Sequence, residues 1–91
     1  MPYIVAVHDI SDPDRFWSAA DASQFPEGIA LHSSYPSGDG TRATCLWEAD
    51  SVDAVRELVE SATGDASANE FFEVNTGHPG VVGLPGARAT A

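Results

Sequence analysis

Two apolar segments separated by a short turn sequence lie in the middle of the chain and limit the folds open to it. The first spans residues 28–35, the second spans Arg42–Glu48, and the six residues between them, "PSGDGT", contain Gly38 and Gly40. Glycine adopts positive φ angles without steric cost, so this pattern predicts a β-hairpin. Whatever the chain forms, it must be built around this central pair of strands.

The N-terminal side of the hairpin predicts a strand followed by a helix. The segment Tyr3–Asp9 is rich in β-branched residues and is too short for a helix, which indicates a strand. Asp12 is a suitable N-cap, and Pro13 fits the first position of a helix. We expect this helix to run from Pro13 to about Asp21, before "QFPEG" interrupts it.

The C-terminal side of the hairpin predicts a helix followed by a strand. The segment "EADSVDAVRELVESATG" carries an apolar stripe at helical spacing, with Asp50 or Ser51 as the N-cap and Gly64 as the C-cap. "NEFFEVN", residues 69–75, predicts the fourth strand.

The resulting order βαββαβ predicts an α+β fold, the ferredoxin-like sandwich, in which two helices cover one face of a four-stranded antiparallel sheet. We expect this domain to span residues 1–76. Residues 77–91, with four Gly and two Pro in "GHPGVVGLPGARATA", form an irregular tail whose "VVGL" packs on its own or a neighbouring subunit. The second sheet face also carries aliphatic and aromatic residues, so we expect a second copy to cover it in a homodimer.

Charge and cysteine content exclude several kinds of partner. The 91 residues include 14 acidic and 4 basic side chains, a net charge of −10, which disfavours nucleic acid and anionic membranes. The single Cys forms no internal disulfide, and "MPYIVAVHDI" does not resemble a targeting peptide. We therefore expect a cytoplasmic protein.

The sequence has no Gly-rich phosphate loop or dinucleotide motif, so we expect no nucleotide cofactor.

Three side chains are candidates for a site in the domain's cavity. If Tyr35 faces Arg42 across the turn, His32 lies directly opposite Cys45, on the same side of the sheet. The ferredoxin-like order brings His8, late in the first strand, close to the early part of the third. Imidazole and thiolate suit Zn, Ni or Cu, so His8, His32 and Cys45 are the predicted metal ligands. A small molecule is the other occupant that we consider.

The same residues allow other interpretations. A lone Cys in a strand often serves as a small buried hydrophobe, and a strand His often has a structural hydrogen bond. Alternatively, the chain is a cofactor-independent oxygenase or isomerase that uses His8 or His32 as general base. A third possibility is a structural dimer with no site.

Two segments carry a resemblance to known proteins. "VHDISDP" and "CLWEADSVDAVRELV" resemble the dimeric α+β barrel superfamily, and more closely the small bacterial proteins first catalogued as a domain of unknown function and later called nickel-responsive or nickel-binding. Those proteins have a His near the end of strand one and a Cys-Leu-x-Glu-(Ala)-x-Ser-x-x-Ala-Val run. These features match His8 and residues 45–55. The family's common His in helix two has no counterpart in "RELVESATG". The resemblance implies a homodimeric barrel and makes nickel the first metal to consider.

Overall fold

The chain folds into four strands and two helices, described by a computed structural model over residues 2–19 and 25–84. The elements follow in the order β1 (Tyr3–Ile10), α1 (Pro13–Ala19), β2 (Ala30–Pro36), β3 (Arg42–Glu48), α2 (Val52–Thr63) and β4 (Ser67–Glu73). The predicted α+β class and the βαββαβ order are confirmed. Of the predicted first helix, the part beyond Ala19 lies outside the described residues.

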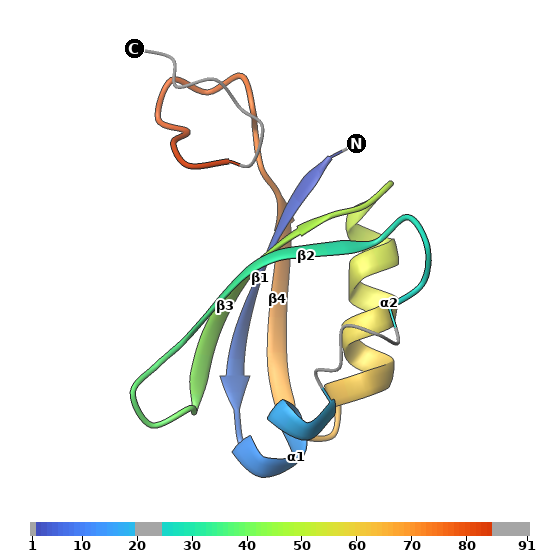
Figure 1. Ribbon diagram of the computed structural model, residues 1–91, viewed down its shortest axis with the longest axis vertical. Coiled ribbons are helices and arrows are strands. Elements are labelled where there is room, and N and C mark those ends of the chain that lie inside the picture. The colour runs from blue at the N-terminus through green and yellow to red at the C-terminus, as the bar shows by residue number, and fades with distance from the viewer. Residues whose placement is uncertain (1, 20–24, 85–91) are drawn as a thin grey trace.

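The four strands form one antiparallel sheet in the order β2-β3-β1-β4 (Figure 1). The two halves of the chain therefore interleave, because β1 lies between β3 and β4 and pairs with both. This arrangement is consistent with the ferredoxin-like fold. Both helices pack on the same side of the sheet, which we call the helix-covered face. Its central side chains come from β1 (Ile4, Ala6, His8, Ile10) and β3 (Ala43, Cys45, Trp47).

Helix α2 is capped at both ends by residues that the sequence predicts as caps. The side-chain oxygen of Ser51 accepts a hydrogen bond of 3.1 Å from the backbone N–H of Ala54, so Ser51 is the N-cap. Val55 and Val59 are buried against the sheet, as the helical spacing of apolar residues predicts. At the other end Gly64 is the C-cap, but its φ of −62° is an ordinary helical value. This cap position therefore does not need glycine for its backbone angle.

The turn between β2 and β3 is organised by one carboxylate. Oδ1 of Asp39 accepts hydrogen bonds from the Ser37 hydroxyl at 2.9 Å, the Thr41 N–H at 3.0 Å and the Thr41 hydroxyl at 2.7 Å. These bonds, led by the one from the Thr41 hydroxyl, lower the pKa of Asp39 to about 2. Gly40 supplies the positive φ, 74°, that the turn requires. The predicted hairpin is confirmed.

Two clusters of buried apolar residues fill the space between the sheet and the helices. The larger cluster consists of Ile4, Ala6, Cys45, Trp47, Ala49, Val55 and Val59. The smaller one joins α1 to the other end of the sheet through Ile10, Phe16, Ala43 and Ala66. Side chains of both clusters line a cavity, described below.

The opposite side of the sheet, the open face, carries Val5, Thr44, Leu46 and Phe72, with Tyr35 at one margin. Tyr35 and Phe72 are 69% and 53% exposed. The tail leaves the end of β4 and extends beyond the sheet (Figure 1). Residues 80–84 and side chains of the open face line a hollow of about 470 Å³ that is open to solvent. Val82 is 89% exposed there.

Some predicted boundaries differ from the observed ones by two residues. The fourth strand begins at Ser67 instead of Asn69, and the second begins at Ala30 instead of Gly28. Neither difference moves a candidate site residue out of its strand. Over the part of the chain that the structure describes, no helix is both long enough and apolar enough to cross a membrane.

Candidate functional site

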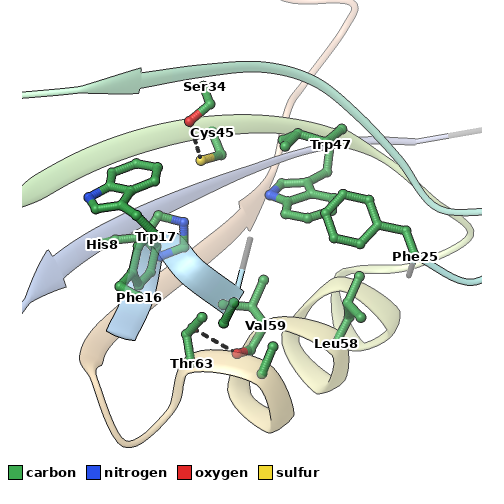
Figure 2. A pocket seen from close by; sticks show the side chains of 13 residues that line it. His8, Phe16, Trp17, Phe25, Ser34, Cys45, Trp47, Leu58, Val59 and Thr63 are labelled. Atoms are coloured by element: carbon green, nitrogen blue, oxygen red, sulfur yellow. Dashed lines mark hydrogen bonds between the residues drawn. The ribbon is translucent and has the colours of Figure 1, made fainter. Parts of the chain in front are cut away.

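The cavity lies between the helix-covered face and the two helices (Figure 2). Its volume is about 50 Å³. One water needs about 10–15 Å³, so the cavity has room for a few waters or a small organic group. Its wall consists of His8, Phe16, Trp17, Ala19, Phe25, Leu31, Ser34, Cys45, Trp47, Leu58, Val59, Ala62 and Thr63.

Hydrogen bonds hold the polar side chain of His8 in a definite orientation in this wall. It lies directly opposite Asn69 in the β1–β4 pairing, and its Nδ1 is 2.6 Å from Oδ1 of Asn69. The other end of that amide, Nδ2, donates a hydrogen bond of 2.9 Å to the Glu60 carboxylate of α2. A carboxylate only accepts, so the amide oxygen must be the atom that faces His8.

This chain of hydrogen bonds determines the tautomer of His8. Since Oδ1 of Asn69 accepts, Nδ1 of His8 must carry the proton, and Nε2 then holds the lone pair. With Nδ1 bonded to Asn69, Nε2 is the ring nitrogen left to serve an occupant of the cavity. The arrangement therefore leaves a hydrogen-bond acceptor in a mostly apolar wall.

Burial keeps the His8 ring neutral. The side chain is only 2% exposed, and its ring packs against Phe16 with 5.0 Å between ring centroids. Desolvation lowers the pKa of His8 below 6.5, and the Asn69 hydrogen bond and the charge of Glu60 oppose this only in part. At neutral pH His8 is thus an unprotonated imidazole, the form that accepts a proton.

Cys45 lies in the same wall but has the opposite character. Its side chain is 5% exposed, and its thiol donates to the Ser34 hydroxyl over 3.4 Å. Burial raises the pKa of the Cys45 thiol, and the Ser34 contact only partly offsets this. The thiol therefore stays protonated at neutral pH, and a protonated thiol is a poor nucleophile and a poor metal ligand.

The predicted pairing of His32 with Cys45 is wrong. Ser34, not His32, lies opposite Cys45, and Tyr35 lies opposite Thr44 instead of Arg42. The hairpin closes two residues later than predicted, with the N–H of Ser37 donating to the carbonyl of Arg42 at 2.7 Å.

A bulge in β2 then moves His32 to the other face. A shift of two residues alone would have kept it on the helix-covered face, because side chains alternate with a period of two. However, Leu31 pairs with Trp47 while Ser33 pairs with Leu46, so His32 is the extra residue of the bulge. One inserted residue reverses the alternation. Leu31, instead of His32, therefore lines the cavity.

On the open face His32 belongs to a different group of side chains. Its Nε2 is 2.8 Å from Oε1 of Glu48, and its ring lies 5.7 Å from that of Tyr3. The structure thus brings His8 and Cys45 to one cavity and places His32 across the sheet from them. Among the described residues, no group of three or more His, Cys, Asp and Glu side chains is arranged to hold a metal ion. Two soft donors face the cavity instead of the predicted three.

Three groups of this site were not identified from the sequence. Asn69 and Glu60 orient His8, and the pairing of β1 with β4 in a ferredoxin-like sheet was the signal that pointed to Asn69. The third is the indole N–H of Trp47, a residue that is not among the predicted site residues. Its position depends on packing that strand alternation does not specify.

Comparisons with protein-family models, with curated proteins and with solved structures found no match to this chain.

Proposed function

We propose that this protein is a homodimer that binds a small organic molecule in the cavity between its sheet and helices. The observation that carries the proposal is the neutral, oriented imidazole of His8 in an apolar wall. Binding sites for small molecules are mostly apolar with a few fixed polar groups, and this cavity has that composition.

The hydrogen bonds around His8 favour a binding role over a purely structural one. A structural His is satisfied by the hydrogen bonds of its surroundings, whereas this network uses Nδ1 alone and leaves Nε2 for the cavity. Glu60 and Asn69 hold the ring in place, so an occupant with a hydroxyl meets an acceptor that is already oriented. Such preorganisation lowers the entropic cost of binding.

The dimer part of the proposal rests on the open face. Leu46, Phe72 and Tyr35 present apolar surface there, opposite the side that the helices cover. A second copy related by a two-fold axis would cover this surface with the same surface of its own. We propose that two sheets pack in this way as a dimeric α+β barrel, with one cavity in each subunit.

Proton transfer is a second candidate function. A neutral imidazole in a desolvated cavity is the form that a general base requires, and His8 has this form at neutral pH. A cofactor-independent oxygenase or isomerase would use Nε2 of His8 to remove a proton from its substrate. His32 has no access to the cavity in this arrangement and therefore does not have that role.

A transition metal is the other candidate occupant. His8 and Cys45 both line the cavity, and the resemblance of "VHDISDP" and "CLWEADSVDAVRELV" to nickel-binding proteins makes Ni²⁺ the metal to test. The two donors present do not complete a three-ligand site, and the thiol would first have to lose its proton. The small organic ligand is therefore the better-supported occupant.

Methyl-detected NMR with two isomeric probes tests the proposal. Butan-2-ol and diethyl ether have the same atoms, but only butan-2-ol has a hydroxyl hydrogen to donate to Nε2 of His8. We expect millimolar butan-2-ol to shift the methyl signals of Leu58, Val59 and Ala62 and to leave that of Val82 unchanged. Diethyl ether should bind about 3- to 10-fold more weakly, the value of one neutral hydrogen bond.

A His8→Leu variant is the matched control. It replaces the imidazole with an apolar side chain of similar reach and so removes the acceptor. It should bind the two probes equally. If neither probe shifts the cavity methyl groups of the unmodified protein, the cavity is not a binding site and the proposal is wrong.

A further inference from the structure

The indole N–H of Trp47 is a buried donor without a partner. Trp47 is 5% exposed, and among the described residues its Nε1 is the one side-chain nitrogen or oxygen that is itself fully shielded from solvent and makes no hydrogen bond. Trp17 provides the contrast, because its Nε1 donates to the carbonyl of Gly40 at 3.0 Å. Buried donors in folded proteins are nearly always paired, so an unpaired one needs an explanation.

The position of this N–H supplies the explanation. Trp47 lines the same cavity as His8. Figure 2 shows the nitrogen edge of its indole turned away from Phe25 and toward the side of the cavity where His8 and Trp17 lie. The Phe25 ring packs against Trp47 with 5.1 Å between ring centroids, which holds the indole in that orientation. The cavity thus contains one fixed donor besides the fixed acceptor of His8.

The remaining wall disfavours a charged occupant. The described residues that line the cavity include no Asp, Glu, Lys or Arg. An anion would find no cationic partner inside a chain of net charge −10, and a cation would find no carboxylate. Burying an unpaired charge is unfavourable, so a neutral molecule is the occupant that this wall accepts.

We infer that the cavity binds a small uncharged molecule with two polar groups, a carbonyl-type oxygen that accepts from Nε1 of Trp47 and a hydroxyl that donates to Nε2 of His8. Hydroxy-ketones are the simplest class with both groups. This inference rests on the proposed function, since it names the class of molecule that the same cavity binds.

Four probes of nearly equal size separate the two contacts. The compound 3-hydroxybutan-2-one has both polar groups, butan-2-one has only the carbonyl, and butan-2-ol has only the hydroxyl. Lactate has the shape of the hydroxy-ketone but carries a negative charge. The readout is the pair of indole N–H signals in an ¹⁵N–¹H spectrum, where Trp17 is the internal reference because its donor is already bonded.

We expect 3-hydroxybutan-2-one to bind most tightly and to move the Trp47 indole signal far more than that of Trp17. Butan-2-one should move the same signal at higher concentration. Butan-2-ol should shift the cavity methyl groups without a downfield shift of the Trp47 N–H, and lactate should do neither. A Trp47→Phe variant should lose about 3- to 10-fold in affinity for the two ketones and keep its affinity for butan-2-ol. A Tyr35→Phe variant, on the open face, should bind all four probes unchanged.

The outcomes distinguish this inference from the proposed function. If butan-2-ol occupies the cavity but neither ketone moves the Trp47 signal, the assignment of Trp47 is wrong and the proposed function stands. Tighter binding of lactate than of 3-hydroxybutan-2-one would overturn the neutral ligand class. If no probe shifts the cavity methyl groups, both proposals fail. The indole signals are read on the unmodified protein, so the test does not depend on the folding of a variant.

Discussion

His8 and His32 lie on opposite faces of one sheet, and their surroundings give them different chemistry. His8 is buried, neutral and held in one tautomer by Asn69 and Glu60. His32 stays partly in water beside Glu48, with 27% of its side chain exposed. A partly exposed side-chain contact of that kind contributes little to stability. The comparison shows that the face of the sheet, more than the residue type, decides which His is a candidate for function.

The aromatic residues repeat this contrast. Phe16 is 4% exposed in the smaller core cluster, whereas Phe72 is 53% exposed on the open face. One face is therefore covered by the helices of the chain itself, and the other has the exposed apolar surface expected of an interface. Substitutions on each face test this difference.

The largest difference is expected from the two phenylalanines. Phe16→Ala should lower the free energy of unfolding by about 3–5 kcal/mol, because it removes a fully buried ring and leaves a cavity. Phe72→Ala should lower it by about 1 kcal/mol or less when measured on the monomer, since half of that ring is already in water. Urea denaturation at low protein concentration measures both. Equal losses would contradict the assignment of the two faces.

The proposed interface is tested by placing a charge on the open face. Phe72→Glu should raise the dissociation constant of the homodimer at least about a hundredfold, which corresponds to about 2.7 kcal/mol, because it buries an unpaired carboxylate. Light scattering over a dilution series measures this change. Ser61→Glu places the same charge on the exposed side of α2 and should leave the dimer intact. A monomeric unmodified protein at micromolar concentration would refute the interface.

The buried histidine should make stability depend on pH. The pKa of His8 is lowered in the folded state, so below about pH 6.5 the unfolded chain binds a proton that the folded chain does not. The free energy of unfolding should therefore fall as pH drops from 7 through the folded pKa, by at most about 1.4 kcal/mol per pH unit. His8→Gln should remove this part of the pH dependence. His78→Gln, in the exposed tail, should retain it, and an unchanged slope in His8→Gln would contradict a neutral buried His8.

The elements could be predicted from the sequence because their signals are local. Ser51 caps α2 with its own side chain, and Gly40 and Asp39 define the turn within a few residues. Strand alternation likewise places Cys45 on a definite face once β3 is known. These features need no knowledge of distant parts of the chain.

The site could be predicted only in part because it depends on register. Nothing in "IALHSSYPS" reveals that His32 is inserted as a bulge, and that one residue reverses which face it occupies. The link from His8 to Asn69 spans 61 positions and exists only because β1 pairs with β4. His8 and Cys45 were predicted for one cavity and lie in one, whereas the predicted position of His32 was wrong.

The smallest effect is expected from nickel. If Ni²⁺ binds His8 and Cys45, it should stabilise the protein by about 1 kcal/mol when free metal is about five times the dissociation constant, and less at lower pH. His8→Ala and Cys45→Ser should each abolish the effect on the melting temperature. His32→Ala should leave it unchanged, because that side chain lies on the open face. Loss of nickel stabilisation in His32→Ala alone would reverse the comparison of the two faces.

Long-range ¹⁵N–¹H correlations of the imidazole at pH 7 report the protonation of the His8 ring, on which the proposed binding role depends. We predict a proton on Nδ1 and a lone pair on Nε2. We also predict that saturating 3-hydroxybutan-2-one changes the Nε2 signal far more than the Nδ1 signal. A cationic ring, a proton on Nε2, or an Nε2 signal that no cavity probe changes would contradict the account.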